Sequence, residues 1–410
     1  MKICMLTKYP PIEGGVSSAA YWLARALGAR GHEVHVVTNA LEVEDCYRER
    51  IDAGDPRWNP PGVYVHSTLP GYEANPMHIP YSPAFCERLA GLALRVAREY
   101  AIDVVDCWYL MPYAAAGHLV AALTGVPLVV RHAGSDVGRL ARVSELGELF
   151  RCLLGAATIV VSSAAARDAL QALDVPSEHV RLLPQAVADP AVFNPAAAPL
   201  DAARLPFPRP GPPIIMHAGK IPHYWQSKGL GELLVALARM AGAGEDFRFL
   251  LVADGPRLEQ VGEMARAALG ERFGRLPFVP PWDMPGLLRW AHCMVLPERG
   301  FEVSGHYSQT AMEALLTGTC AVLGQELRQH PAHAFLEPGR EVLTVDPLDV
   351  LALAAALTDV LRRPERARDV AAAGRRAIMA QVDYDSFISD NERIYGEAAQ
   401  YRRAVQAGPS

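Results

Sequence analysis

The sequence predicts an α/β protein built from two doubly wound, Rossmann-like parallel sheets that face each other across a cleft. The chain has 410 residues, more than the roughly 250–300 residues at which a single hydrophobic core stops growing. Short apolar runs alternate with longer segments of helical period, which is typical of parallel sheets covered by helices. A proline-rich stretch interrupts this alternation midway. Open α/β sheets bind ligands beyond the C-terminal ends of their strands, so the cleft is the expected site.

The elements of the first half follow from local patterns. Ile3–Leu6 is an apolar run that predicts the first strand. Val16–Arg30 has apolar residues at helical spacing and ends before Gly31, a residue type that often follows a helix. Val34–Thr38 predicts the second strand. The same reasoning predicts strands at Val63–His66, Ile102–Asp106, Leu128–Arg131 and Thr158–Ser162, and helices at Phe85–Tyr100, Pro112–Thr124, Ser144–Gly155 and Ala164–Leu173.

The stretch from Pro195 to Pro213 contains seven prolines, which exclude a helix or a central strand and predict a semi-rigid linker. The alternation then restarts. It predicts strands at Ile214–Ala218, Phe247–Val252, Leu276–Val279, Met294–Pro297 and Ala321–Leu323, and helices at Gly229–Ala241, Arg257–Leu269, Met284–Ala291, Gln309–Thr317, Leu348–Arg362, Pro364–Gln381 and Asp385–Val405. We therefore divide the chain into a first domain (1–195), a linker (196–213), a second domain (214–382) and a final helical segment (383–410).

Composition narrows the class of protein. With 50% hydrophobic and 20% charged residues, the chain has the composition of a packed soluble protein. A formal net charge of −6 gives no overall basic field for a nucleic-acid backbone, so no nucleic-acid partner is expected. The seven scattered cysteines form no C-x-x-C pair, which argues against a zinc site or a disulfide framework. Neither a signal peptide nor an 18-residue apolar run is evident, so we expect a cytoplasmic protein that does not span a membrane.

A glycine pair, Gly14-Gly15, lies between the first strand and its helix. A helix start reached through two glycines presents free backbone N–H groups and a partial positive charge to a phosphate or to sugar oxygens. The segment is not a G-x-G-x-x-G fingerprint, and the chain contains no P-loop motif. The alternative is a plain tight turn.

Lysine is rare in this chain, which has only Lys2, Lys8, Lys220 and Lys228. Lys220 and Lys228 bracket the loop between the first strand of the second domain and its helix. Two mobile point charges at a strand end that faces the cleft suit a leaving diphosphate. The alternative is an ordinary pair of surface lysines.

Other candidates follow strand ends or begin helices. His132 follows an apolar strand, where it could contact a substrate hydroxyl or be satisfied locally. Asp254-Gly255-Pro256 suits a turn with proline at the first helical position. Glu313 could accept both hydroxyls of a ribose, or be an exposed helix charge.

Together these segments resemble the GT-B glycosyltransferases, most closely the retaining enzymes of glycosyltransferase family 4. Each motif is weakly specific, and the resemblance rests on their order and spacing over most of the chain. The motifs are Gly14-Gly15-Val16, His132-x-Gly134-x-Asp136, Val180-x-Leu182-Leu183-Pro184 with Phe193-x-Pro195, Gly219-Lys220 with Lys228-Gly229, Asp254-Gly255-Pro256, and Glu313-Ala314-x-x-x-Gly318.

The resemblance implies a nucleotide-diphosphate sugar held mainly by the second domain and an acceptor held mainly by the first. It implies transfer with retention of configuration, without an essential metal or another cofactor, and a final helix that returns to the first domain. Lys220 and Lys228 would contact the diphosphate, Glu313 the ribose, and His132 the transferred sugar. The implied catalytic residues are therefore His132, Lys220 and Lys228. The implied donor site also includes Gly14, Gly15, Gly219, Asp254, Gly255 and Glu302, and the implied acceptor site comprises His132 and Asp136.

Three departures from the family pattern predict an unusual donor sugar or acceptor. Lys220 replaces the usual arginine, which keeps the charge and loses the bidentate fork. A Glu-x7-Glu element would need glutamate at Gly305, and the nearest candidates are Glu298 and Glu302, so the loop Phe301–Ser308 is remodelled. Finally, Gln185-Ala186-Val187-Ala188 replaces the usual Asn-Gly-Val-Asp.

We therefore expect a metal-independent retaining glycosyltransferase that moves a hexose-type unit to a small-molecule or lipid-linked acceptor. The only Asp-x-Asp, Asp383-Tyr384-Asp385, opens the last predicted helix and is expected to cap it. Peripheral membrane contact, the nucleobase, the sugar and the oligomeric state are left open. The alternatives are a nucleotide-sugar epimerase or sugar phosphorylase on the same fold, and a non-catalytic protein that binds sugar nucleotides.

Overall fold

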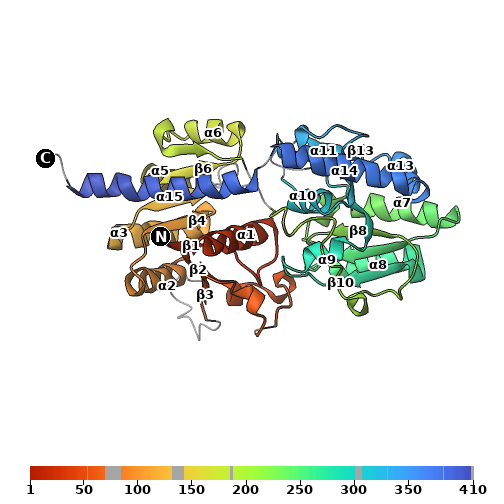
Figure 1. The fold of residues 1–410 in the computed structure, drawn as a ribbon, viewed down its shortest axis with the longest axis horizontal. Coiled ribbons are helices and arrows are strands. Elements are labelled where there is room, and N and C mark those ends of the chain that lie inside the picture. Colours follow the sequence, from red (N-terminus) through yellow and green to blue (C-terminus); the bar gives the residue numbers. More distant parts are fainter. Residues whose placement is uncertain are drawn as a thin grey trace.

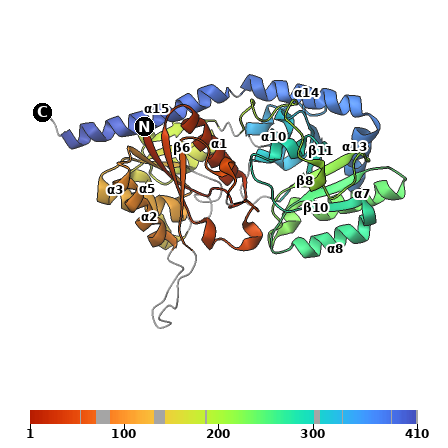
Figure 2. The ribbon, with the colours of Figure 1, turned by 60° about the horizontal axis from the view of Figure 1, so that its bottom comes forward.

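The chain forms two parallel-sheet lobes that lie side by side, with a long C-terminal helix lying along the first lobe (Figures 1 and 2). The structure is a computed structural model and describes residues 1–52, 54–69, 85–131, 143–184, 188–300, 307–329, 331–381 and 383–407. The two sheets account for the two alternating patterns in the sequence, and the helices lie on both of their faces.

The first sheet has seven parallel strands in the order β3-β2-β1-β4-β5-β6-β7. Its central strands are almost fully buried, as expected of a parallel sheet covered on both faces. The elements are β1 (Lys2–Leu6), α1 (Gly15–Ala29), β2 (Glu33–Thr38), β3 (Val63–Ser67), α2 (Phe85–Glu99), β4 (Val104–Trp108), α3 (Ala115–Thr124), β5 (Leu128–Arg131), α5 (Ser144–Gly155), β6 (Thr158–Val161), α6 (Ala164–Gln171) and β7 (Val180–Leu182).

The second sheet has six parallel strands in the order β10-β9-β8-β11-β12-β13. Its elements are β8 (Ile214–Ala218), α7 (Leu230–Gly242), β9 (Arg248–Val252), α8 (Leu258–Leu269), β10 (Phe273–Leu276), α9 (Met284–Leu288), β11 (Ala291–Leu296), α10 (Gln309–Leu316), β12 (Cys320–Gly324), α11 (Gln325–Arg328), α12 (Pro331–Ala334), β13 (Leu343–Val345), α13 (Val350–Arg362), α14 (Pro364–Gln381) and α15 (Tyr384–Ala407). Among the described helices, none is both long and apolar enough to cross a membrane.

Several sequence predictions need correction. The strand predicted at Leu276–Val279 lies at Phe273–Leu276, because Pro277 has no N–H with which to continue the ladder. The helix predicted to extend to Ala291 ends at Leu288, and Ala291 begins β11. The strand predicted at Ile102–Asp106 is displaced to β4 (Val104–Trp108), and the edge strands β7 and β13 were not predicted.

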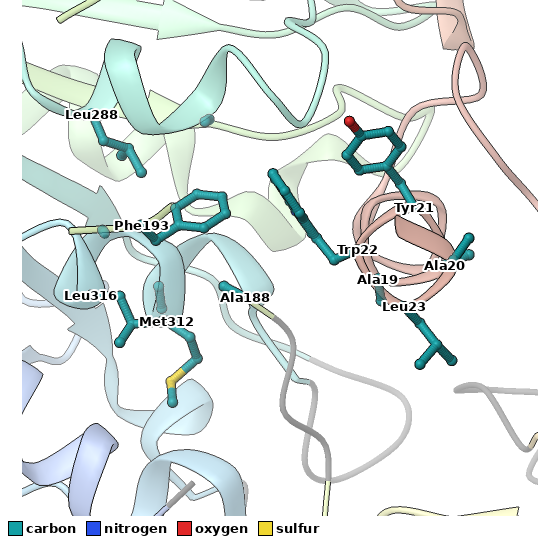
Figure 3. Close-up of a cluster of buried hydrophobic side chains, with 14 of the residues drawn as sticks. Ala19, Ala20, Tyr21, Trp22, Leu23, Ala188, Phe193, Leu288, Met312 and Leu316 are labelled. Carbon is teal, nitrogen blue, oxygen red and sulfur yellow. The ribbon is translucent and has the colours of Figure 1, made fainter. Parts of the chain in front are cut away.

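Helix α1 joins the two lobes. Trp22 of α1 meets Phe193 edge to face, with ring centroids 5.4 Å apart (Figure 3). The ring centroid of Tyr21 lies 5.0 Å from that of Trp282 in the second lobe. Tyr21, Trp22 and Phe193 belong to one buried cluster that also contains strand residues from both sheets, and the partly buried Trp282 packs against it. Because the outer face of α1 packs against the second lobe, the start of this helix is held at the boundary between the lobes.

The C-terminal helix docks on the first lobe through buried polar contacts. Arg131, at the end of β5, donates to both carboxylate oxygens of Asp106 and to the hydroxyl of Tyr395 in α15. The Tyr395 hydroxyl in turn donates to Asp106 over 2.8 Å. This confirms the expectation that the C-terminal helix returns to the first lobe.

Candidate active site

The candidate site lies where the order of strands reverses in each sheet. In the first sheet the reversal is between β1 and β4, and in the second it is between β8 and β11. Ligands of open α/β sheets bind beyond the C-terminal ends of such strands. The loop after β1 and the loop after β8 meet there, because Lys220 Nζ lies 3.2 Å from Glu13 Oε1. This ion pair joins the two lobes.

The loop before α1 brings two ammonium groups to one point. Gly14 has a φ of 120°, a conformation that favours glycine. A Cβ at Gly14 would lie 3.3 Å from Lys8 Nζ and 3.9 Å from Lys220 Nζ. Lys8 Nζ also donates to the Glu13 carbonyl over 2.9 Å. Both cations therefore lie beside the N-terminus of α1, where the helix dipole adds to the attraction for an anion.

The surroundings of these lysines shift their pKa values in opposite directions. Burial, followed by the charge of Lys220, lowers the pKa of Lys8 to about 8, while Glu13 and Glu49 oppose that shift. The Glu13 carboxylate raises the pKa of Lys220. Lys220 thus carries a full charge at neutral pH, whereas Lys8 titrates near the upper end of the physiological range.

Lys228 is held on a short turn beneath a second carboxylate. It ends the 3-10 turn Trp225–Lys228, and Gly229 follows with a φ of 64° and packs against the Pro297 backbone. Lys228 Nζ lies 2.9 Å from Glu298 Oε1, and the two side chains are 13% and 5% exposed. Glu298 follows β11, so the cation and its partner come from neighbouring strand ends.

A buried histidine supports this corner of the site. His217 Nδ1 lies 2.9 Å from the Val295 carbonyl, and burial lowers the pKa of His217 to about 4. The neutral ring therefore donates through Nδ1. Its Nε2 has no hydrogen-bond partner in the described part of the chain, and a Cβ at Gly219 would lie 3.7 Å from it.

Asp254 and Gly255 hold the loop that carries Lys220. The Asp254 carbonyl accepts from Ile221 N over 2.8 Å, and the Asp254 side chain accepts from Gly255 N over 2.8 Å. A side chain at Gly255 would collide with the Ile221 backbone. The contacts of Asp254 and Gly255 in the structure are therefore those that hold this loop in place. Helix α8 begins at Leu258, so Pro256 is not its first residue as predicted.

Glu313 lies in the middle of α10 and is only 4% exposed, which excludes the alternative of an exposed helix charge. Gln309 Nε2 donates to Glu313 Oε1 over 2.7 Å and to Ser18 Oγ over 2.6 Å. Ser18 of α1 also lies 3.4 Å from Glu313 Oε1. Burial raises the pKa of Glu313 to about 7. The Glu313 carboxyl therefore faces the first lobe and changes charge near neutral pH.

Of the residues predicted from the sequence, the structure brings Gly14 close to Lys220. It also brings Gly15 close to Gln309 of α10, which contacts Glu313. A Cβ at Gly15 would lie 3.5 Å from Gln309 Oε1. His132, Asp136 and Glu302 lie outside the described residues. The sequence prediction missed four residues at this site: Lys8, Glu13, Ser18 and Gln309. Of these, only Lys8 carried a signal, because lysine is rare in this chain and Lys8 lies with Lys220 beside Gly14. The sequence prediction named Glu298 as a candidate for the missing glutamate but not as the partner of Lys228.

Two protein families match successive parts of the chain. Residues 14–186 match the family described as Glycosyl transferase 4-like domain. Residues 212–363 match the family described as Glycosyl transferases group 1. The first match ends shortly before the proline-rich stretch and the second begins just before β8.

Individual proteins are similar over different shares of the chain. A 2-deoxystreptamine glucosyltransferase from Streptomyces kanamyceticus is 35% identical over 128 residues, which is 30% of this chain and 31% of that protein. A glycogen synthase from Mycobacterium tuberculosis is 25% identical over 99% of this chain and 97% of its own length. Anabaena Alr3699/HepE, solved in complex with UDP-glucose, superimposes with a TM-score of 0.67 at 16% identity, covering 98% of this chain and 100% of that one. The chain is a glycosyltransferase of the family 4 and group 1 type with the GT-B fold.

Proposed function

We propose that the protein transfers a sugar, with retention of configuration and without a metal ion, from a nucleotide-diphosphate sugar to a small-molecule or lipid-linked acceptor. The observation that carries the proposal is the meeting of Lys220 with the loop before α1, where Lys220 Nζ lies 3.2 Å from Glu13. A cation of the second lobe and the helix N-terminus of the first lobe thereby converge on one point. That arrangement suits a diphosphate.

The lysines would stabilise the leaving group. As the bond between the anomeric carbon and the diphosphate oxygen breaks, negative charge develops on the diphosphate. Lys220, Lys228 and the backbone N–H groups at the start of α1 are placed before the reaction begins, so they need little reorganisation when that charge appears. The acceptor hydroxyl forms the new bond to the anomeric carbon, and its proton leaves with the nucleoside diphosphate.

Glu313 would hold the ribose. Its carboxyl is buried and already accepts a side-chain N–H from Gln309. An ionised carboxylate can accept a hydrogen bond from each of two neighbouring hydroxyls. The Glu313 carboxyl therefore suits the 2′ and 3′ hydroxyls of a nucleoside, in the second lobe and beside the diphosphate lysines.

The acceptor would bind mainly to the first lobe, with His132 beside the transferred sugar and Asp136 nearby. The similarity to a 2-deoxystreptamine glucosyltransferase supports a small-molecule acceptor, and the likeness to a UDP-glucose complex makes UDP-glucose the first donor to test. Metal independence is supported by the position of the Asp-x-Asp motif, which caps a helix instead of being available to a metal ion. Asp383 accepts from Asp385 N and Ser386 Oγ at the start of α15, where it acts as a cap.

The test combines the protein with UDP-, ADP-, GDP- and dTDP-glucose, with and without a panel of aminocyclitol, polyol and lipid-linked acceptors. We expect release of nucleoside diphosphate that requires both donor and acceptor, an α-linked product, and unchanged rates in EDTA. Conversion of the donor alone would indicate an epimerase, and binding without turnover would indicate a non-catalytic protein. Loss of activity in EDTA with rescue by manganese would refute metal independence.

A variant pair separates the two halves of the proposed site. His132→Ala should lower turnover and leave nucleoside-diphosphate affinity nearly unchanged, because it removes a contact to the reacting sugar only. Glu313→Ala should instead weaken nucleoside-diphosphate binding by about 1.5–3 kcal/mol, the scale of a charge-assisted hydrogen bond. Calorimetry on both variants measures the difference. Equal weakening by both would remove His132 from the proposed catalytic set.

A further inference from the structure

We propose that Glu13 is a donor-site residue that sets the affinity for diphosphates by exchanging partners: it pairs with Lys220 until a diphosphate takes that lysine, and then pairs with Lys8. This inference rests on the proposed donor role of Lys220 and adds a residue that neither the sequence motifs nor the family matches point to.

The first step is the burial of the Glu13 carboxylate. Its side chain is 8% exposed, while that of Lys220 is 40% exposed. A carboxylate removed from water needs a cation or several hydrogen bonds to remain charged. The buried Glu13 carboxylate therefore needs Lys220 in order to stay charged, whereas the Lys220 ammonium group can be solvated by water. A ligand can also approach this ammonium group from solvent.

The second step is competition. Lys220 Nζ lies 3.2 Å from Glu13 Oε1, and a diphosphate oxygen bound to the same ammonium group would approach the carboxylate closely. Like charges in contact repel strongly in a partly desolvated site. A diphosphate on Lys220 consequently drives the Glu13 carboxylate away from that lysine, and part of its binding free energy is spent on doing so.

The third step is the availability of a second cation. Lys8 Nζ already donates to the Glu13 carbonyl over 2.9 Å. Lys8 and Lys220 approach the same glycine, with their nitrogens 3.3 and 3.9 Å from the position of a Gly14 Cβ. The Glu13 side chain can therefore pass from Lys220 to Lys8 by rotation about its own bonds, and it remains paired after the exchange.

The exchange also predicts that the protein takes up a proton when a diphosphate binds. The titratable groups that act on Lys8 are Glu13 and Glu49, whose ionised forms favour the charged form of Lys8, and Lys220, which opposes it. A diphosphate neutralises the field of Lys220, and the arriving Glu13 carboxylate strengthens the attraction. Both changes raise the pKa of Lys8 from about 8. Near pH 8 the protein should therefore take up a proton when a diphosphate binds.

The main experiment compares wild-type protein with Glu13→Gln by calorimetry at pH 8, using UDP, pyrophosphate and uridine as probes. We expect Glu13→Gln to bind UDP and pyrophosphate about tenfold more tightly, because the diphosphate no longer has to break the ion pair between Glu13 and Lys220. The affinity of Glu13→Gln for uridine should equal that of wild-type protein. Glu365→Gln, an exposed glutamate in α14, makes the same change in net charge and should alter binding less than twofold. Unchanged or weaker diphosphate binding in Glu13→Gln overturns the proposal, as does equal tightening for uridine.

Lys8 is tested separately. Wild-type protein should show proton uptake with UDP when the heat is compared in HEPES and Tris at pH 8, and Lys8→Met should abolish it. Lys8→Met alone should also weaken UDP binding. Added to Glu13→Gln, the same substitution should weaken UDP binding much less, because the displaced side chain is no longer a carboxylate that needs a second cation. Lys2→Met is the matched control, since it is the one lysine of the sequence away from the site. Equal effects of Lys8→Met in both backgrounds contradict the exchange.

Lys220→Met distinguishes this proposal from the proposed function. If UDP and pyrophosphate bind Lys220→Met as tightly as wild-type protein, the donor role of Lys220 is wrong and both proposals fail. If Lys220→Met weakens their binding but Glu13→Gln does not tighten it, the donor role stands and the exchange alone is refuted. Absence of binding of either probe to wild-type protein and to Glu13→Gln also refutes both.

Discussion

Tyr395 of the C-terminal helix donates its hydroxyl proton to Asp106 of β4 over 2.8 Å, although 289 residues separate the two in sequence. The same hydroxyl accepts from Arg131 over 2.9 Å. Arg131 lies 5.2 Å from the centre of the Trp108 ring, so the guanidinium group is enclosed by charge and by aromatic surface. A buried ion pair whose remaining groups are satisfied by a tyrosine fixes α15 on the first lobe in one position.

Tyr395→Phe should therefore loosen α15. The substitution keeps the ring and removes the hydroxyl shared by Arg131 and Asp106, which should cost about 1–3 kcal/mol for the buried polar groups left with fewer partners. Hydrogen exchange resolved by peptide should show faster exchange in 384–407 than in wild-type protein. Tyr64→Phe, at a half-exposed tyrosine of β3, is the matched control and should leave α15 unchanged. Unchanged exchange in Tyr395→Phe would show that apolar packing alone holds the helix.

Lys228 and Glu298 should show separate effects on stability and turnover. Lys228→Met removes the cation from a carboxylate that is 5% exposed, and a broken buried pair costs about 3–5 kcal/mol of folding free energy. Lys228→Met/Glu298→Gln should recover most of that stability. It should not recover turnover, because a cation at the leaving diphosphate contributes about 2–4 kcal/mol to the transition state. Thermal unfolding and initial rates on the three proteins test this, and recovery of turnover in the double variant would refute the catalytic role of Lys228.

Glu313 should make nucleoside binding depend on pH. Burial raises its pKa to about 7, so the carboxyl is mostly protonated below that pH and ionised above it. Ribose hydroxyls donate more strongly to the ionised form, and the affinity for uridine should therefore rise from pH 6 to pH 8 and level off. Uridine is chosen because it carries no phosphate that titrates in this range. Glu313→Gln should bind uridine more weakly at pH 8 and show no such rise, and a wild-type profile without a slope would contradict the assignment.

Glu49 should reduce stability at neutral and higher pH. Burial, followed by the charge of Glu13, raises the pKa of Glu49 well above its ordinary value, and its Oε2 has no hydrogen-bond partner among the described residues. The unfolded chain releases this proton near pH 4.5, whereas the folded protein retains it to higher pH, so stability falls as pH rises through that interval. Glu49→Gln should raise the free energy of unfolding at pH 8, and the gain should shrink towards pH 5. A variant less stable than wild type at pH 8 would show that the ionised carboxylate has a partner.

The sequence by itself determined the class of fold and most of its elements. Strands Leu128–Arg131 and Ile214–Ala218 and helix Pro364–Gln381 have the predicted bounds, because each is set by local properties: an apolar run, the periodicity of apolar residues, and flanking prolines or glycines. Two lysines and a glycine pair also predicted an anion site at the ends of the first strands of the two domains. These features depend on residues that are close in sequence.

Tertiary structure alone decided which charges meet. Edge strands such as β13 are too short for a local pattern and form because β12 offers a partner. Glu13 in the predicted glycine loop gave no sign of its pairing with Lys220, and Glu298 none of its pairing with Lys228. The position of Glu13 follows from the packing of α1 between the lobes, through contacts such as that of Tyr21 with Trp282. Periodicity records which face of a segment is buried, whereas the partner of a buried charge depends on how distant segments pack, and a single segment does not contain that information.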